Sequence, residues 1–170
     1  LTVYPDQPYD QPEVIHPITG MPIVTPQSCG DFSRVFPKEE KVLELVQQKV
    51  ANGERVLIYT SWTRTDSQQK LLKLMQENGY RTEILTKQIP TEKREEWVDK
   101  RVKSGLQVLI TNPRCVETGL DLNAFTTIIY YSMGYNLFTL RQASRRSWRI
   151  NQTAPKVEGY MFCLLYTSDA

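Results

Sequence analysis

The sequence predicts an α/β domain built around a central, mostly parallel sheet. Short runs rich in β-branched and aromatic residues alternate with segments whose apolar residues recur at helical spacing. Glycine follows the first three helical segments, where helices commonly end. This alternation gives βαβ units, whose strands pair in parallel. The chain has 170 residues, 40% of them hydrophobic, which is enough for one domain with its own core.

The first 36 residues have a different character. Residues 1–36 contain six prolines and no apolar periodicity, which predicts an irregular, proline-rich linker or arm. The globular domain is predicted to span 37–162. Pro37 suits the first turn of a helix, and Asn52-Gly53 suits its end.

The remaining elements follow from the same signals. A buried strand is predicted where β-branched and aromatic residues cluster, and a helix where Leu71, Leu74 and Met75 share one face. Thr91 can cap another helix. The predicted order is strand 55–60, helix 66–78, strand 81–85, helix 91–103, strand 107–111, strand 127–131, helix 137–148 and strand 157–164.

Composition excludes several classes of protein. The net charge is +2, so any case for nucleic acid rests on local clustering. The three cysteines have no C-x-x-C spacing, and His16 is the single histidine, so neither a zinc site nor a disulfide framework is expected. These features, with the lack of a signal-peptide or membrane-spanning pattern, predict a cytoplasmic protein without membrane contact.

Residues 141–152 carry the strongest chemical signal. Four arginines fall within nine positions there, and no acidic residue occurs from 122 to 157. In a helix, Gln142, Arg146 and Arg149 would share one face. Guanidinium groups bind phosphate oxygens in pairs and stay protonated. The segment therefore favours contact with phosphate or nucleic acid; the alternative is a solvated basic helix, although such helices usually interleave glutamate.

Loops after the first three predicted strands are further candidates, because ligands of open α/β sheets bind at the carboxyl ends of strands. The first loop holds Thr60 and Ser61, whose hydroxyls suit either a phosphate backbone or the cap of the next helix. Asp121, in the third loop, also fits an ordinary turn. Cys115 is predicted to be a small buried residue, since no histidine lies near it in the sequence to activate it.

The string 141–152 resembles motif VI of superfamily 2 helicases and translocases, in the Gln-Ala-x-x-Arg-x-x-Arg-Ile-x-Gln form of Swi/Snf-type ATPases. Residues 56–61 resemble motif IV, and residues 119–122 (Gly-Leu-Asp-Leu) resemble the core of motif V. The three motifs occur in the family's order. The chain departs from the pattern at Asn151, where glycine is usual, and at 112–117, which replace a Ser-Thr-x-Ala-Gly-Gly segment.

This resemblance implies the C-terminal RecA-like lobe, a three-layer fold, of an enzyme that hydrolyses ATP. ATP and Mg²⁺ would lie against a preceding N-terminal lobe of the same protein, and Arg146 and Arg149 would reach the phosphates as arginine fingers. Gln142 and Gly119 would lie at the nucleotide, and Asp121 would hold its ribose. Nucleic acid, expected to be double-stranded DNA, would contact five residues: Thr60, Ser61, Thr86, Lys87 and Thr118.

The chain has no G-x-x-x-x-G-K-[S/T] loop and no Asp-Glu-x-His box. By itself it is therefore expected to lack ATPase activity, with ATP and Mg²⁺ held mainly by the other lobe. Two alternatives stay open. One is a strand-separating DNA or RNA helicase of the same superfamily. The other is a non-catalytic module that binds nucleic acid.

Residues 163–170 resemble the translation of a transposase adapter used in sequencing libraries and are interpreted as a non-native tail. The alternative is a real strand followed by a polar turn. Deleting Thr167–Ala170 should leave the melting temperature unchanged, because a polar tail that did not evolve with the fold buries little surface. A drop of several degrees in calorimetry would instead show that the tail is native and packed.

Overall fold

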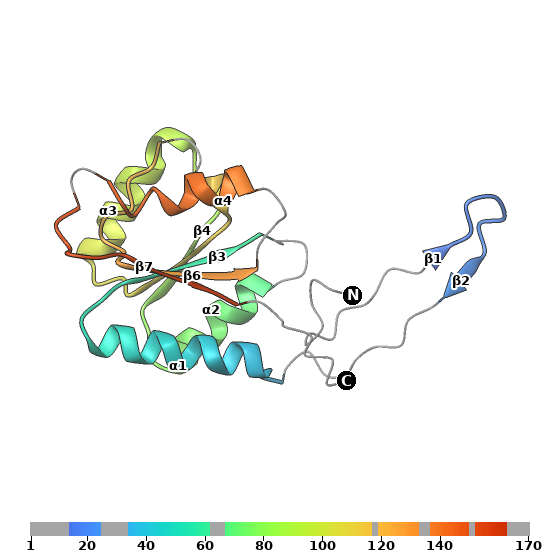
Figure 1. The fold of residues 1–170 in the computed structure, drawn as a ribbon, viewed down its shortest axis with the longest axis horizontal. Coiled ribbons are helices and arrows are strands. Elements are labelled where there is room, and N and C mark those ends of the chain that lie inside the picture. Colours follow the sequence, from blue (N-terminus) through green and yellow to red (C-terminus); the bar gives the residue numbers. More distant parts are fainter. Residues whose placement is uncertain are drawn as a thin grey trace. The chain divides into compact units, whose positions relative to one another are not determined.

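A five-stranded sheet of order β4-β5-β3-β6-β7, with every neighbouring pair parallel, organises the molecule (Figure 1). The computed structural model describes residues 14–24, 34–61, 67–116, 119–132, 137–149 and 152–162. The strands are β3 (Val56–Thr60), β4 (Thr82–Leu85), β5 (Val108–Thr111), β6 (Thr127–Ser132) and β7 (Glu158–Met161). The predicted α/β class is confirmed. The last strand is shorter than predicted, and residues 163–170 lie outside the described part of the chain.

Helices cover both faces of the sheet and make three layers (Figure 1). Helices α1 (Pro37–Ala51) and α2 (Ser67–Glu77) pack Val46 and Leu71 against Ile58 and Ile110. On the other face, α3 (Arg94–Lys103) and α4 (Leu137–Ser144) pack against the opposite side chains of the same strands. Because both faces are covered, β3, β5 and β6 are buried along their whole length. Two short 3₁₀ turns, η1 (Thr91–Lys93) and η2 (Pro113–Cys115), complete the fold.

Helix α1 begins and ends as its sequence predicts. Pro37 occupies the first helical position, and the buried carboxylate of Glu39 accepts a hydrogen bond from the Phe36 N–H at 3.0 Å. At the other end, Gly53 has a φ of 78°, and the following Glu54 N–H donates to the Lys49 carbonyl at 3.1 Å. A left-handed glycine of this kind satisfies helix carbonyls that would otherwise lack partners.

The chain divides into two compact units, Leu1–Glu40 and Lys41–Ala170. The first contains a small antiparallel hairpin, β1 (Val14–Ile15) and β2 (Pro22–Val24), where the sequence predicted no regular element. Its turn is local: the His16 Nδ1 accepts hydrogen bonds from the N–H groups of Ile18 and Thr19, and Gly20 takes a φ of 65°. Strands this short fall below the length at which alternation is visible in a sequence.

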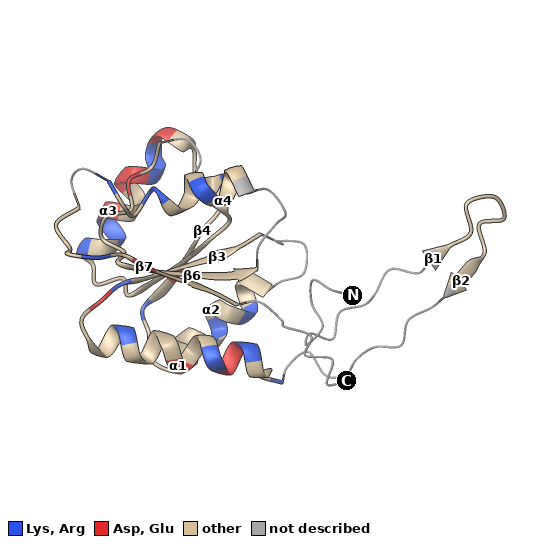
Figure 2. Ribbon diagram, viewed as in Figure 1, with Lys and Arg blue, Asp and Glu red and all other residues tan. Residues whose placement is uncertain are grey.

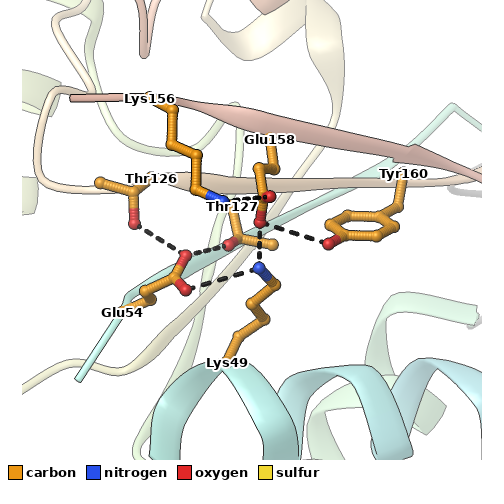
Figure 3. A network of polar contacts seen from close by, with 7 residues as sticks. All are labelled: Lys49, Glu54, Thr126, Thr127, Lys156, Glu158 and Tyr160. Atoms are coloured by element: carbon orange, nitrogen blue, oxygen red, sulfur yellow. Dashed lines mark hydrogen bonds and ion pairs between the residues drawn. The ribbon is translucent and has the colours of Figure 1, made fainter. Parts of the chain in front are cut away.

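A network of charged and hydroxyl groups closes the amino-terminal edge of the sheet (Figure 3). The buried ammonium of Lys49, in the last turn of α1, contacts Glu158 at the start of β7 and lies 3.4 Å from Glu54 before β3. The Glu54 carboxylate accepts hydrogen bonds from Thr127 at 2.7 Å and from Thr126 at 3.3 Å. Lys156 and Tyr160 donate to Glu158 at 2.8 Å and 3.3 Å. One network therefore joins α1 to three strands.

This network predicts acid sensitivity. Hydrogen bonds from Lys156 and Lys49 lower the pKa of Glu158 from 4.5 to about 2. Because the folded pKa lies below the unfolded one, the contribution of Glu158 to stability is present above about pH 4.5 and is lost as pH falls toward 2. Glu158→Gln should therefore destabilise the chain at pH 7 and flatten the dependence of its stability on pH between 5 and 2.

Urea unfolding at pH 7, 5 and 3 measures this dependence. Glu44→Gln is the matched control, because Glu44 pairs with Lys41 on the surface, where both side chains are more than half exposed. The two variants should differ at pH 7 and converge near pH 2. Parallel curves for Glu158→Gln and the unmodified chain would contradict the role of this carboxylate.

Candidate functional site

The carboxyl-terminal edge of the sheet carries the predicted motifs, and neutral hydrogen bonds tie its loops together. The Ser61 N–H, directly after β3, donates to the Ser132 hydroxyl at 2.9 Å, at the end of β6. The Asn112 amide, directly after β5, donates to the Ser61 carbonyl at 3.0 Å. Its Oδ1 accepts a hydrogen bond from the Arg114 N–H at 2.9 Å. Asn112 thus joins two loops at the point where the chain departs from the family pattern.

Two stacked tyrosines hold the end of α4. Tyr59 on β3 and Tyr130 on β6 have ring centroids 5.7 Å apart. The Tyr59 hydroxyl donates to the Ala143 carbonyl at 3.1 Å, and the Tyr130 hydroxyl hydrogen bonds to the Ser144 hydroxyl. Because both partners lie in the last turn of α4, the sheet fixes the position from which the arginine-rich segment leaves the helix.

Helix α4 ends at Ser144, so the prediction of a helix to 148 is wrong, and Gln142, Arg146 and Arg149 do not share one helical face. Residues 145–149 form turns. The Arg146 N–H bonds to the Ala143 carbonyl in a tighter turn, and the Arg146 carbonyl accepts from the Leu122 N–H at 3.0 Å. This tertiary bond to the motif V loop replaces the next helical bond. Helix α4 itself carries one basic residue, Arg141, and no acidic residue (Figure 2).

The two predicted arginine fingers occupy different environments. Arg149 is partly exposed, and its guanidinium lies 2.6 Å from the Asp121 carboxylate as an ion pair. The contact lacks hydrogen-bond alignment, since Asp121 Oδ1 is a buried oxygen without a hydrogen-bond donor. Arg146 is 9% exposed. Burial and the neighbouring Tyr130 raise the pKa of Tyr59, and the nearby positive charge of Arg146 opposes that rise.

The other predicted nucleotide residues are Gln142 and Gly119. Gln142 is half-buried on α4, in the turn that precedes the arginine segment. Gly119 is exposed and takes a φ of 94°, a conformation that favours glycine. It lies two residues before Asp121. The structure therefore brings Asp121 and Arg149 into contact and leaves Gln142 and Gly119 on the flanking segments.

The predicted nucleic-acid residues differ in exposure. Lys87 is exposed, and Ser61 and Thr86 are half-buried. Thr60 is fully buried, and its hydroxyl accepts a hydrogen bond from the Gln68 amide at 2.8 Å. Thr118 lies outside the described residues.

Residues 37–151 match the family model of the helicase conserved C-terminal domain. This chain belongs to the helicase C-terminal domain family. Its relatives include the helicase/translocase YwqA of Bacillus subtilis, 30% identical over 115 residues, and the chromatin-remodeling ATPase INO80 of Mus musculus, 25% identical over 146 residues. These alignments cover 68% and 81% of this chain but 12% and 9% of the relatives. This helicase domain is thus about a tenth of each relative's length.

A third relative is the helicase SWR1 of Debaryomyces hansenii, 30% identical over 141 residues, which are 78% of this chain and 8% of SWR1. The predicted membership, the C-terminal lobe of a superfamily 2, Swi/Snf-type ATPase, is confirmed. Among solved structures, the C-terminal part of the Fun30 ATPase domain superposes with a TM-score of 0.69 at 21% identity, over 79% of this chain and 43% of that one. This likeness supports the RecA-like fold of the helicase domain.

Within the described residues of the helicase domain, no group of three histidine, cysteine or acidic side chains could hold a metal ion. No helix there is both long enough and apolar enough to span a bilayer. Cys115 is buried, as predicted. The sequence analysis did not identify Tyr59, Tyr130 or Asn112 as site residues, because their contacts join positions far apart in the chain.

Arg94 is a further residue of this edge whose role the sequence did not show. It is 8% exposed at the start of α3. Its Nε donates to the Ile89 carbonyl at 2.9 Å, and its terminal nitrogen donates to the Cys115 carbonyl at 2.8 Å. The guanidinium therefore joins the loop that holds Thr86 and Lys87 to the loop of motif V.

Arg94→Met should destabilise the helicase domain by about 3 kcal/mol, since two buried carbonyls lose charged donors. Arg101→Met is the matched control: Arg101 pairs with Glu83 on the surface, with side-chain exposures of 43% and 40%, and should cost less than about 1 kcal/mol. Urea unfolding of both variants compares them. Equal losses of unfolding free energy in the two variants would show that the hydrogen bonds of Arg94 do not stabilise the domain.

Proposed function

We propose that this domain is the second lobe of an ATP-driven translocase that moves along duplex DNA. A preceding lobe of the same protein would hold ATP and Mg²⁺, and this lobe would supply Arg149 to the phosphates. The observation that supports the proposal most directly is the pairing of Arg149 with Asp121, within a Swi/Snf-type domain.

The two side chains fit the two ends of a nucleotide. Among the described residues, Asp121 Oδ1 accepts no aligned hydrogen bond and is contacted by Arg149, and a ribose hydroxyl is a suitable donor to this carboxylate once Arg149 turns away. The Arg149 guanidinium is partly exposed and can turn from this carboxylate to a phosphate. Bound ATP would supply the phosphoryl group whose transfer to water drives movement. The role of this chain would be to orient the phosphoryl group and to stabilise the negative charge that develops on it.

Arg146 takes a supporting part in this proposal. Arg146 is nearly buried, and its positive charge lies near Tyr59. From there it adds positive potential at the phosphates, while Arg149 makes the contact. Gln142 and Gly119 would border the same nucleotide from α4 and from the motif V loop.

For DNA, the proposed contacts are the exposed Lys87, the half-buried Ser61 and Thr86, and Thr118, which lies outside the described residues. Thr60 would position this loop from the interior, because its buried hydroxyl is held by a hydrogen bond from Gln68. Hydroxyl, ammonium and backbone groups bind the phosphate chain without reading bases, which suits a motor that moves over any sequence. The INO80 relative, a chromatin-remodeling ATPase, supports this choice.

Arg149→Lys in the two-lobe protein should lower ATP turnover by roughly a thousandfold and leave duplex binding nearly unchanged. Lysine keeps the charge but loses the planar pair of donors. ATPase rate and gel-shift affinity are measured on one preparation, with Arg145→Lys, an exposed neighbour, as the control. If binding falls and the turnover of each bound complex does not, Arg149 is a nucleic-acid contact and the proposal fails.

A strand-separating helicase of the same superfamily is the second candidate, and the relative SWR1, a helicase, favours it. A fluorescent duplex with a single-stranded tail distinguishes the two. ATP-dependent strand release would favour the helicase. ATPase stimulation by blunt duplex without release would favour the translocase.

A further inference from the structure

Gln152 lies at the end of the motif VI segment, and its side chain makes three hydrogen bonds. The amide Nε2 donates to the Ser147 carbonyl at 2.7 Å and to the Asn123 carbonyl at 3.0 Å. The amide Oε1 accepts from the Ala154 N–H at 2.9 Å. Since Ser147 precedes Arg149 and Asn123 follows Asp121, one amide joins the arginine turn to the motif V loop.

Two further polar contacts between these segments are seen among the described residues. The Leu122 N–H donates to the Arg146 carbonyl at 3.0 Å, and Arg149 pairs with Asp121. Other buried atoms of the junction contribute no hydrogen bond: Asn123 Oδ1 and the Ser147 hydroxyl have no partner among the described residues. With this many unsatisfied groups, the spacing of the two segments depends heavily on the Gln152 amide.

We propose that Gln152 is a positioning residue for the ATPase reaction, which holds the Arg149 turn at the distance from Asp121 that phosphate contact requires. The inference rests on the proposed function. Gln152 touches neither reacting atom; it acts through the backbone at Ser147 and Asn123. A catalytic group displaced by about 1 Å can lose on the order of a hundredfold in rate, so a small shift of this turn has a large effect.

The first test uses Gln152→Glu and Gln152→Met in the two-lobe protein. Glutamate keeps the shape and loses both donors, and methionine loses them without adding charge. Both variants should lower kcat by about 10- to 100-fold with the KM for ATP changed less than about threefold. Gln76→Glu is the matched control, since the Gln76 amide donates to the Thr82 carbonyl at 3.2 Å at the opposite edge of the sheet. It should leave kcat unchanged.

A second measurement separates positioning from general loss of structure. In the 170-residue chain, Gln152→Met should speed hydrogen exchange at the Leu122 N–H, which bonds to Arg146, by about tenfold or more. The Val56 N–H, which bonds to the Gln107 carbonyl at 2.9 Å, should keep its protection. Equal acceleration at both sites, or a kcat that does not change, would overturn the inference.

Combination with Arg149→Lys separates this inference from the proposed function. If Gln152 acts through Arg149, Gln152→Met should add no further loss of turnover to the Arg149→Lys variant. Additive losses would overturn the inference and leave the proposed function intact. Full turnover in Arg149→Lys alone would overturn the proposed function, and the inference with it.

Discussion

The parallel arrangement of five strands, buried on both faces, is the constraint on which the rest of this domain depends. Because all five strands run the same way, the loops after β3, β5 and β6 meet at one edge. Because both faces are covered, no side chain of the inner strands is free to bind a ligand. Chemistry is confined to the loops, and the helices serve to place them.

The two edges of the sheet are stabilised by different interactions. At the amino-terminal edge, Lys49 and Lys156 balance the charges of Glu54 and Glu158 within one network (Figure 3). At the carboxyl-terminal edge, loops are held mainly by amides and hydroxyls such as those of Asn112, Ser132 and Gln152. Charged groups take part in the loops as well, because Arg94 donates to two loop carbonyls and Arg149 pairs with Asp121.

At the end of α4, tertiary hydrogen bonds override the local helix propensity of the sequence. Residues 145–149 have a composition that a helix accepts, yet the helix ends at Ser144. Tyr59 and Tyr130 hold the last turn of α4 through hydrogen bonds, and the Leu122 N–H donates a hydrogen bond to the Arg146 carbonyl. These bonds turn the chain toward the motif V loop, so Arg149 meets Asp121 instead of continuing along a helical face. The contact pairs the last arginine of motif VI with the acid of motif V.

The sequence by itself determined the fold class, the order of the elements and the family, because hydrophobic periodicity and the three motifs are local patterns. Only the tertiary structure decided which arginine is exposed, where α4 ends, and which residues hold the loops. Arg94, Asn112 and Gln152 act through backbone carbonyls distant in the sequence. Every residue carries the same backbone carbonyl, so the sequence does not show which carbonyl a side chain will bind.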